Sequence, residues 1–429
     1  MTITDSPKPF SNSHPVTTSE DLSSDAFWDQ TFEQRDETFA RLRKDAPVSW
    51  HLPRHVVDVP AEEVDAGFWA LTKRDDINLA SQDHSTFSSD QQKGGMTFRS
   101  LDRATLGPPT FLSMDPPFHT RYRQIMSAAF TPKAVGRLRE QIEARAEQIV
   151  DRVVGGGRFD FVGEVSAKLP MLTVADLVGV PESQVEAFAE AGDNFVGAAD
   201  PEFLAPGGDR LAWAMHQIDV LRQIGVDLVE YRRRKPSDDI ATALANARFD
   251  GEPLGPEDIG SVMLLLSVAG NDTTKQTTTR TVMSLWQNPE QRDWLAADYD
   301  GRIGQSIEEF IRHASPVLEF ARTVLRDTEI RGQQIQAGDK VVLFYCSGNR
   351  DEEVWEDPHR FDLQRERRPH VGFGGGGVHF CLGNGVAKAQ LRALFSQILT
   401  RLPSMEVGAP EYLRSDFING VKHLPVVVP

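Results

Sequence analysis

Apolar residues recur with the spacing of α-helices through the middle of the chain. They repeat every three to four residues over 137–154, 211–234 and 386–402. The helical repeat of 137–154 also continues through the 180s. The longest run opens at Pro256, a residue type favoured in the first turn of a helix, and reaches Gln287. This pattern predicts a mainly α-helical protein.

Strand signals are short and lie toward the two ends of the chain. Residues 48–53 and 67–73 combine aromatic and β-branched residues between Pro, Gly and charged residues. Residues 322–350 predict short strands with Gly turns, and the tail to Pro429 is strand-like. Residues 90–114 contain five Gly or Pro and predict a long loop of functional use. We therefore expect minor β structure beside the helices.

Composition adds a simple domain organisation. Hydrophobic residues make up 40% of the 429 residues and charged residues 25%, which excludes wholesale disorder. Residues 1–25 are rich in Ser, Thr and Pro and predict a flexible N-terminal tail. Residues 26–429 are predicted to form one large helical domain with a small β-rich region.

The charge and the apolar runs exclude several functions. Acidic residues outnumber basic ones 63 to 46, for a net charge of −17, which argues against nucleic-acid binding but leaves room for a local basic patch. No apolar run approaches the roughly 20 residues of a membrane span, and the first 25 residues resemble no secretory signal. Two cysteines cannot form a disulfide framework, so we expect a reduced, cytoplasmic setting.

Cys381 stands between a run of glycines and the helical segment that begins at Val386. A thiolate at a helix N-terminus is stabilised by the helix dipole and by free N–H groups, which suits a sulfur ligand to iron. The alternatives are a buried structural cysteine and a dinucleotide-binding glycine loop. The second is disfavoured because Arg367, Arg368 and Pro369 stand where a hydrophobic strand should lead in.

An ordered set of motifs supports the iron-ligand interpretation. Cys381 is preceded by Phe373, Gly377 and His379 and followed by Gly383, and this loop resembles the haem-binding loop of the cytochrome P450 family. Phe373 lies eight residues before the cysteine, one more than in the usual family pattern. Four upstream segments also resemble the family: 115–123 (DPPFHTRYR), 269–274 (AGNDTT), 309–312 (EFIR) and 355–362 (WEDPHRFD).

The resemblance implies a cytochrome P450 fold, with one large helical domain around haem b and a small β-rich region, and a haem-thiolate monooxygenase. Cys381 would be the iron ligand. His119, Arg123, Arg322 and His379 would bind the haem propionates, with Asp115 as the cap of the helix that carries the first two. The remaining haem-contacting residues would be Phe373, Gly383 and Ala269. Cys346 is expected to be inert core within a strand.

The long predicted helix would carry the oxygen chemistry. Leu266, Ala269 and Thr273 share one helical face, which could also be a plain core stripe. Asp272 would relay protons and Thr273 would hold the reacting oxygen group. Gly270 is unfavourable within a helix, and a widened turn at bound dioxygen would explain its presence. Glu309 and Arg312 would form a buried structural pair, although Glu230 and Arg233 have the same spacing and such pairs are usually exposed.

Within the family, five segments are most similar to actinobacterial enzymes that oxidise methyl-branched lipids and sterol side chains. They are VAGNDTT, ASPV, YCSGNRDE, PHVGFGGGGVHFCLG and FINGVKHLPV. We expect an apolar, methyl-branched lipid or terpenoid to be oxidised near a chain end, with sterol side-chain hydroxylation as the alternative. The predicted substrate residues are Met96, Phe98, Leu266, Val317, Leu318, Phe417 and Ile418.

The resemblance also implies partners. Electrons would come from NAD(P)H through a ferredoxin reductase and a ferredoxin, because two cysteines cannot hold an Fe–S cluster that needs four. A monomer is expected. A haem sensor without turnover is an alternative of another class, and the adjacent Asp272 and Thr273 argue against it.

Overall fold

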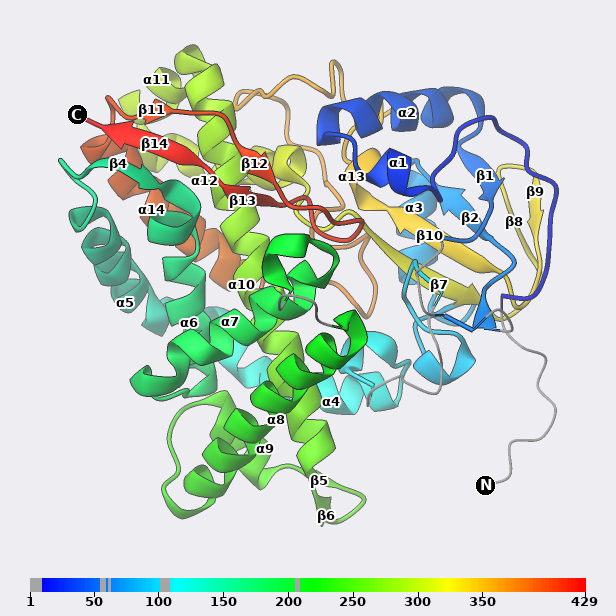
Figure 1. Cartoon of the computed structure of the whole chain (residues 1–429), viewed down its shortest axis with the longest axis horizontal. Coiled ribbons are helices and arrows are strands. Elements are labelled where there is room, and N and C mark those ends of the chain that lie inside the picture. Colours follow the sequence, from blue (N-terminus) through cyan, green and yellow to red (C-terminus); the bar gives the residue numbers. More distant parts are fainter. Residues whose placement is uncertain (1–9, 55–58, 61–62, 101–108, 205–208) are drawn as a thin grey trace. The chain divides into compact units, whose positions relative to one another are not determined.

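The predicted helices and strands are formed in a computed structural model of the chain (Figure 1). The structure describes residues 10–54, 59–60, 63–100, 109–204 and 209–429. The chain divides into two compact units, which we describe in turn. Unit 1 comprises residues 1–120, 317–359 and 368–381, and unit 2 comprises residues 121–316, 360–367 and 382–429.

Unit 1 is built on a five-stranded mixed sheet. In spatial order its strands are β1 (Val48–His51), β2 (Phe68–Leu71), β10 (Lys340–Phe344), β7 (Glu319–Val324) and β3 (Phe87–Ser88). The pair β2 and β10 is parallel and the other pairs are antiparallel. A separate hairpin is formed by β8 (Thr328–Ile330) and β9 (Gln333–Ile335). The strands predicted around 48–53, 67–73 and 322–350 are confirmed.

Four helices accompany this sheet. They are α1 (Asp25–Trp28), α2 (Phe32–Asp45), α3 (Arg74–Gln82) and α13 (Tyr345–Gly348), and α13 contacts both α2 and α3. Helix α2 begins at a capping box in which Thr31 and Gln34 satisfy each other's backbone N–H groups. Short 3₁₀ turns, η2 (Gln91–Lys93) and η4 (Phe111–Ser113), lie within the predicted long loop; residues 101–108 of that loop lie outside the described residues.

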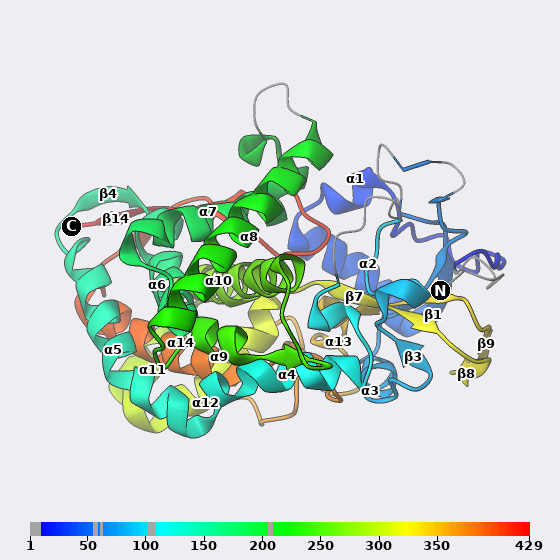
Figure 2. The same cartoon turned by 90° about the horizontal axis from the view of Figure 1, so that it is seen from below.

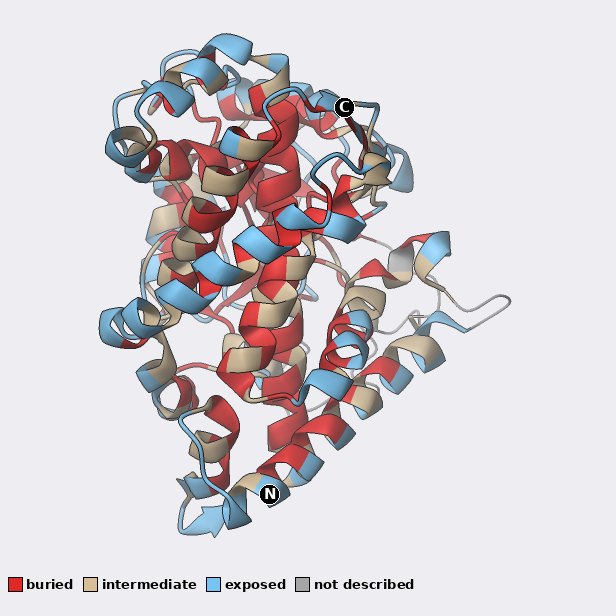
Figure 3. Ribbon diagram, turned by 90° about the vertical axis from the view of Figure 1, so that its left-hand side faces the viewer, coloured by how far each residue is buried: buried red, intermediate tan, exposed pale blue. Residues whose placement is uncertain are grey.

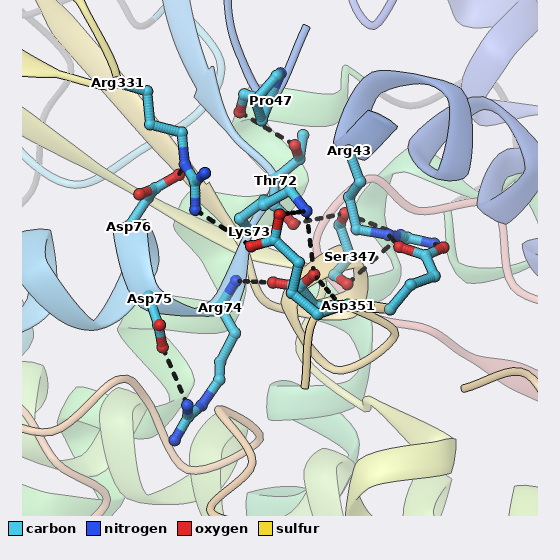
Figure 4. A network of polar contacts seen from close by, with 12 residues as sticks. Arg43, Pro47, Thr72, Lys73, Arg74, Asp75, Asp76, Arg331, Ser347 and Asp351 are labelled. Carbon is cyan, nitrogen blue, oxygen red and sulfur yellow. Dashed lines mark hydrogen bonds and ion pairs between the residues drawn. The ribbon is translucent and has the colours of Figure 1, made fainter. Parts of the chain in front are cut away.

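A network of charged side chains joins the YCSGNRDE segment to the other elements of unit 1 (Figure 4). The Asp351 carboxylate accepts a hydrogen bond from the backbone N–H of Arg74 at 3.0 Å and another from Lys73 Nζ at 3.3 Å. Arg331 Nε donates to Asp76 Oδ2 at 2.6 Å. These contacts assign a structural role to part of a segment that sequence analysis had linked to substrate class.

The N-terminal segment packs along unit 1 from Phe10 onward. Phe10 is buried, and Asn12 Nδ2 donates to Asp339 Oδ1 at 2.9 Å. The flexible tail predicted over 1–25 therefore has fixed contacts from Phe10 onward. Residues 1–9 lie outside the described residues.

Unit 2 is mostly helical, and its outer helices carry buried residues on one side and exposed residues on the other (Figure 3). They are α4 (Phe118–Ser127, which begins at the end of unit 1), α5 (Pro132–Asp151), α6 (Lys168–Val178), α7 (Val185–Val196), α8 (Arg210–Arg234), α9 (Ile240–Asn246), α10 (Pro256–Gln287), α11 (Pro289–Ala297), α12 (Tyr299–Ala314) and α14 (Asn384–Arg401). The central helix α10 packs against α6, α7, α8 and α12 (Figure 2).

Three small sheets complete unit 2. One has the order β11 (Glu406–Val407), β14 (Pro425–Val428), β4 (Gly157–Asp160), and the hairpins are β12 (Glu411–Tyr412) with β13 (Val421–His423) and β5 (Arg248–Phe249) with β6 (Glu252–Pro253). The helical pattern predicted from 137–154 through the 180s forms as α5, α6 and α7, but β4 interrupts it, which the sequence did not predict. Gly155 and Gly157 adopt positive φ angles, +66° and +69°, in the turn that leads from α5 into β4.

None of the helices in the described ranges combines the length and the apolar character that a membrane crossing requires.

Candidate active site

The loop that carries Cys381 is organised by its own backbone. The N–H of Cys381 donates to the carbonyl oxygen of Phe373 at 3.0 Å, and the N–H of Phe380 donates to that of Gly377 at 3.2 Å. The rings of Phe373 and Phe380 meet edge to face, with centroids 6.2 Å apart. Helix α14 follows in the sequence at Asn384. The thiol is therefore held in a closed turn just before a helix, as the sequence predicts.

The loop between Phe373 and Cys381 is one residue longer than the usual family pattern, and glycines with left-handed backbone conformations accommodate the extra residue. Gly374 has φ +88° and Gly377 has φ +74°, conformations that other residues rarely adopt. At Gly377 a Cβ would lie 2.3 Å from the backbone oxygen of Ser81 on α3, so no side chain fits there. The turn keeps Phe373 hydrogen-bonded to Cys381 although eight residue positions separate them.

The two cysteines differ in their surroundings. Cys346 lies in the short helix α13 and not in a strand as expected, and it is 1% exposed. Burial raises the pKa of its thiol to about 12, so it stays protonated, as expected for inert core. Cys381 is half-buried and takes part in no disulfide. Only Cys381 has the exposure that a ligand requires.

Two histidines from distant motifs come together in unit 1. The rings of His119 and His379 meet edge to face, with centroids 4.4 Å apart. His119 is 2% exposed and begins α4, and His379 lies two residues before Cys381. Phe111 packs against His119 with its ring centroid 5.9 Å away. The fold therefore joins the DPPFH motif to the cysteine loop.

Asp115 has a role other than the helix cap predicted for it. Its carboxylate accepts hydrogen bonds from Ser88 Oγ at 2.5 Å and the Ser89 N–H at 3.0 Å, and it pairs with Lys93 at 3.0 Å. The prediction was wrong because donors on β3 and η2 take up both carboxylate oxygens. Asp115 still contributes its backbone oxygen to the His119 N–H.

The two arginines predicted to bind propionates belong to different units. Arg322 lies on β7 opposite Val341 of β10, is 4% exposed, and donates to the Ala321 carbonyl oxygen at 2.7 Å. Arg123 is half-buried on α4 within unit 2. Neither assignment to a propionate is tested by these contacts, so both stay predictions.

Helix α10 opens to solvent at the AGNDTT motif. Between Ile259 and Leu285, which the structure describes in full, only Ala269 is exposed. Leu266 is 9% exposed and Thr273 is half-buried, and the Thr273 hydroxyl donates to the Ala269 carbonyl oxygen at 2.9 Å. The predicted reactive face thus coincides with the open turn of an otherwise buried helix.

Gly270 has a packing function. A Cβ at this position would lie 2.4 Å from a methyl carbon of Val174 on α6. Helix α10 is a regular α-helix throughout Pro256–Gln287, and the widened turn expected at bound dioxygen stays a prediction. The glycine is needed because α6 approaches α10 closely.

Asp272 is buried beside a cation that sequence reasoning missed. It is 3% exposed, and its Oδ1 lies 2.7 Å from Lys275 Nζ. Burial raises the pKa of the Asp272 carboxyl group to about 6, against the opposing effect of Lys275. Lys275 in turn pairs with Asp193 on α7 at 2.9 Å. The spacing of Asp272 and Lys275 on one helix was a usable signal; nothing in the sequence pointed to Asp193.

Glu309 and Arg312 form the predicted buried pair. Arg312 Nε donates to Glu309 Oε2 at 2.7 Å, and both residues are buried. Glu309 Oε1 also accepts the backbone N–H of Asp362, which joins α12 to the WEDPHRFD segment. The pair with identical spacing, Glu230 and Arg233, is exposed. Burial therefore distinguishes the structural Glu309–Arg312 pair from Glu230 and Arg233, which share only its spacing.

The predicted substrate residues fall into two groups. Phe98 and Leu318 lie in the core of unit 1, where the Phe98 ring packs against Phe68 at 4.9 Å and Phe344 at 5.8 Å. Ile418 and Leu266 are also buried. The residues that remain half-buried are Met96, Val317 and Phe417.

Comparison with known proteins identifies the family. A family described as Cytochrome P450 matches residues 210–406. The chain is 38% identical over 419 residues to a methyl-branched lipid omega-hydroxylase of Mycobacterium tuberculosis, covering 95% of this chain and 94% of the relative. It is 36% identical over 400 residues to a steroid C26-monooxygenase of Mycolicibacterium smegmatis, covering 91% and 90%. A Mycobacterium marinum cytochrome P450 solved in complex with pseudoionone has a TM-score of 0.92 and 43% identity, covering 96% of this chain and 99% of that one.

The residues present fit a haem group. Cys381 is half-buried and forms no disulfide among the described residues, and the ring of His379, two residues before it, meets the ring of His119 within unit 1. The comparisons confirm the mainly helical fold with small sheets, the monooxygenase activity and the haem b cofactor that the motifs imply. Since the similarity extends over nearly the whole chain, the protein belongs to the cytochrome P450 family.

Proposed function

We propose that this monooxygenase hydroxylates a methyl-branched, largely apolar lipid or terpenoid at or near a chain end. The supporting observation is that two relatives of nearly full length are named for a methyl-branched lipid and for a steroid, each with a chain-end position in its name. Pseudoionone, bound in the similar solved structure, is also a branched apolar chain. Sterol side-chain hydroxylation is the alternative.

The cysteine loop and the residues that would bind the haem propionates would together hold the cofactor. Cys381 would ligate the iron as a thiolate, and bound haem supplies the binding and reductive activation of dioxygen. His119, Arg123, Arg322 and His379 would hold the propionates by charge-assisted hydrogen bonds. Phe373, Gly383 and Ala269 would contact the macrocycle.

Replacing Cys381 tests this assignment against an internal control. Cys381→Ser should abolish product formation and the red-shifted absorption band that a thiolate ligand gives the reduced, CO-bound enzyme, because an alcohol is a much poorer donor to iron. Cys346→Ser should retain both, since that thiol is buried and protonated. Loss of the band in the Cys346 variant would show that the assignment of Cys381 as the iron ligand is wrong.

Asp272 and Thr273 would manage protons during oxygen activation. Thr273 carries its hydroxyl on the open turn of α10, where it can hold a reacting oxygen group and an ordered water. Asp272 has a pKa raised to about 6 by burial, so it can both hold and release a proton near neutral pH. This arrangement supports a general acid–base role for Asp272.

The substrate pocket would be apolar and would select by shape. The half-buried Met96, Val317 and Phe417 can contact a hydrocarbon chain. A terminal C–H bond is stronger than an internal one, so the pocket must enforce the position of attack. One methyl branch buried against apolar residues contributes about 1–3 kcal/mol, or about 10–200-fold in discrimination.

A spectral titration with matched compounds tests the substrate class. Branched fatty acids and terpenoids should displace the iron-bound water, and so produce the high-spin spectrum, at lower concentration than linear chains of equal length. Mass spectrometry should then locate the new oxygen at or near the chain end. Equal affinity for branched and linear chains, or oxidation mainly in mid-chain, would reject the proposal. A clear preference for a sterol would favour the alternative.

The redox partners and the setting are also part of the proposal. The chain has two cysteines and so lacks the four ligands of an Fe–S cluster, which supports electron supply by a separate ferredoxin and its NAD(P)H-dependent reductase. We also propose that the enzyme is monomeric and cytoplasmic; neither cysteine forms a disulfide among the described residues, which supports a reduced setting.

A further inference from the structure

A buried ionic triad surrounds Asp272 in unit 2. The Lys275 ammonium group lies 2.7 Å from Asp272 Oδ1 and 2.9 Å from Asp193 Oδ1, so one cation serves two carboxylates. The side chains of Lys275 and Asp272 are 8% and 4% exposed, whereas that of Asp193 is 27% exposed. Asp193 is therefore the member of the triad that solvent reaches.

Close packing of α7 on α10 holds the triad together. Asn271 Nδ2 donates to Asp193 Oδ1 at 2.8 Å, and Ser267 Oγ donates to the Phe188 carbonyl oxygen at 2.7 Å. At Gly192, next to Asp193, a Cβ would lie 2.3 Å from Ser267 Oγ. The two helices approach this closely only because a glycine stands at position 192.

The charges of the triad act on Asp272 in opposite directions. Lys275 favours the anionic form of Asp272, and Asp193 disfavours it by like-charge repulsion; these are the two charged groups that act on the carboxyl. Burial adds to the effect of Asp193, and the resulting pKa of Asp272 is about 6. The other carboxylate oxygen, Oδ2, is buried and has no hydrogen-bond partner among the described residues.

We propose that Asp193 and Lys275 are positioning residues that together decide when Asp272 carries a proton. Lys275 holds one oxygen of the Asp272 carboxyl group, and Asp193 holds Lys275 from the solvent side. This inference rests on the proposed role of Asp272 in proton delivery and adds two residues outside the AGNDTT motif to it.

The test exploits the opposite signs of the two charges. In the holoenzyme, Lys275→Met should raise the titration midpoint of Asp272 by about one pH unit or more, because the anion loses its cation. Asp193→Asn should lower that midpoint, because the repelling charge is gone and Lys275 remains. The midpoint is measured by infrared difference spectroscopy of the carboxylic acid band that disappears in Asp272→Asn.

The pH profile of product formed per NAD(P)H consumed gives a second readout. Its midpoint should follow the infrared midpoint, upward in Lys275→Met and downward in Asp193→Asn. Lys275→Arg keeps the cation and should restore a profile close to that of the parent enzyme. A merely structural role would lower activity in both variants without moving the midpoints apart.

Asp176 provides the matched control. It is 28% exposed, lies on α6 of unit 2 and pairs with Arg145 at 2.8 Å, so its surroundings resemble those of Asp193. Asp176→Asn should leave the Asp272 midpoint unchanged. Equal shifts in all carboxylate variants, or shifts of the same sign for Lys275→Met and Asp193→Asn, would overturn the inference. A different outcome would reject the proposed role of Asp272 itself. In that outcome the infrared midpoints of Lys275→Met and Asp193→Asn shift in opposite directions, but Asp272→Asn forms product at the normal rate.

Discussion

At the scale of single residues, surroundings separate residues of the same type into different functions. Neither Cys346 nor Cys381 forms a disulfide among the described residues, but Cys346 is buried whereas Cys381 is half-buried and accessible to a ligand. Glu309 is buried with its arginine, whereas Glu230 has the same motif spacing and lies exposed. Breaking a buried ion pair costs about 3–5 kcal/mol, and an exposed pair contributes about 0–1 kcal/mol. The spacing of a motif therefore indicates a structural ion pair only where the fold buries both residues.

Thr273 gives a prediction at this scale. Thr273→Ala should uncouple the enzyme, so that NAD(P)H is consumed while peroxide is released in place of product, because the hydroxyl that holds the oxygen group is lost. The ratio of product to peroxide measures the effect. Thr400→Ala is the control: its hydroxyl makes the same type of bond, to the Ser396 carbonyl oxygen at 2.7 Å, at an exposed position of α14. Unchanged coupling in Thr273→Ala would assign the motif to packing alone.

At the scale of elements, ionic contacts join short segments that have little apolar surface of their own. The 3₁₀ turn η9 (Pro201–Phe203) is connected to strand β13 in this way. His423 Nε2 lies 2.7 Å from Glu202 Oε1, and Lys422 Nζ lies 2.8 Å from Glu202 Oε2. His423 Nδ1 also pairs with Asp160 on β4 at 2.9 Å. Three segments far apart in sequence thus meet at one histidine.

This cluster predicts a pH-dependent attachment of η9. Hydrogen bonds to Asp160 and Glu202 raise the pKa of His423 above 6.5, so its contribution is complete below pH 6.5 and is lost as pH rises through the raised value. Lys422 and His423 lower the pKa of Glu202 below 4.5, so that contribution is complete above pH 4.5 and is lost in stronger acid. The attachment is therefore strongest between these two values.

Hydrogen–deuterium exchange measures the attachment directly. Protection of η9, corrected for intrinsic exchange, should fall in the parent enzyme as the pH rises above 6.5 and through the raised pKa of His423. His423→Gln should remove this change, because a neutral amide does not titrate. His216→Gln replaces an exposed histidine on α8 and should leave it intact. A pH response that persists in His423→Gln would contradict the assignment.

At the scale of the whole molecule, the net charge of −17 constrains how an electron donor associates. We expect an acidic ferredoxin to meet four basic residues of unit 2, namely Arg121, Arg123, Lys133 and Lys388, although Arg123 is also proposed to bind a haem propionate. Two of them are partly neutralised, because Arg121 pairs with Asp250 at 3.3 Å and Lys388 with Glu308 at 2.7 Å. Lys133 is exposed on α5. It should therefore contribute most to steering.

Electron transfer should consequently depend on salt. The first reduction by a ferredoxin should slow as salt rises beyond about 0.15 M, where the Debye length falls below about 8 Å. Lys133→Gln should slow reduction at low salt and flatten the dependence, and Lys235→Gln, an exposed lysine after α8, is the control. Stopped-flow spectroscopy follows the reduction. A rate that does not change with salt would exclude this docking surface.

The sequence alone was sufficient for features that depend on local order. Helices over 211–234 and from Pro256 to Gln287 were predicted because apolar periodicity and proline at the first turn act within a few residues. The family followed from short motifs in a set order, with Cys381 as their centre. Strand β4 was missed because its partner, β14, lies far away in the sequence, and such pairing leaves no local signature.

Only the tertiary structure decided which polar groups share a neighbourhood. It brought His119 to His379 and placed Asp193 against Lys275, contacts between residues far apart in sequence. It also moved Asp115 from helix cap to partner of Lys93. The physical reason is that helix signals depend on near neighbours along the chain, whereas burial and charge pairing depend on which surfaces packing brings together.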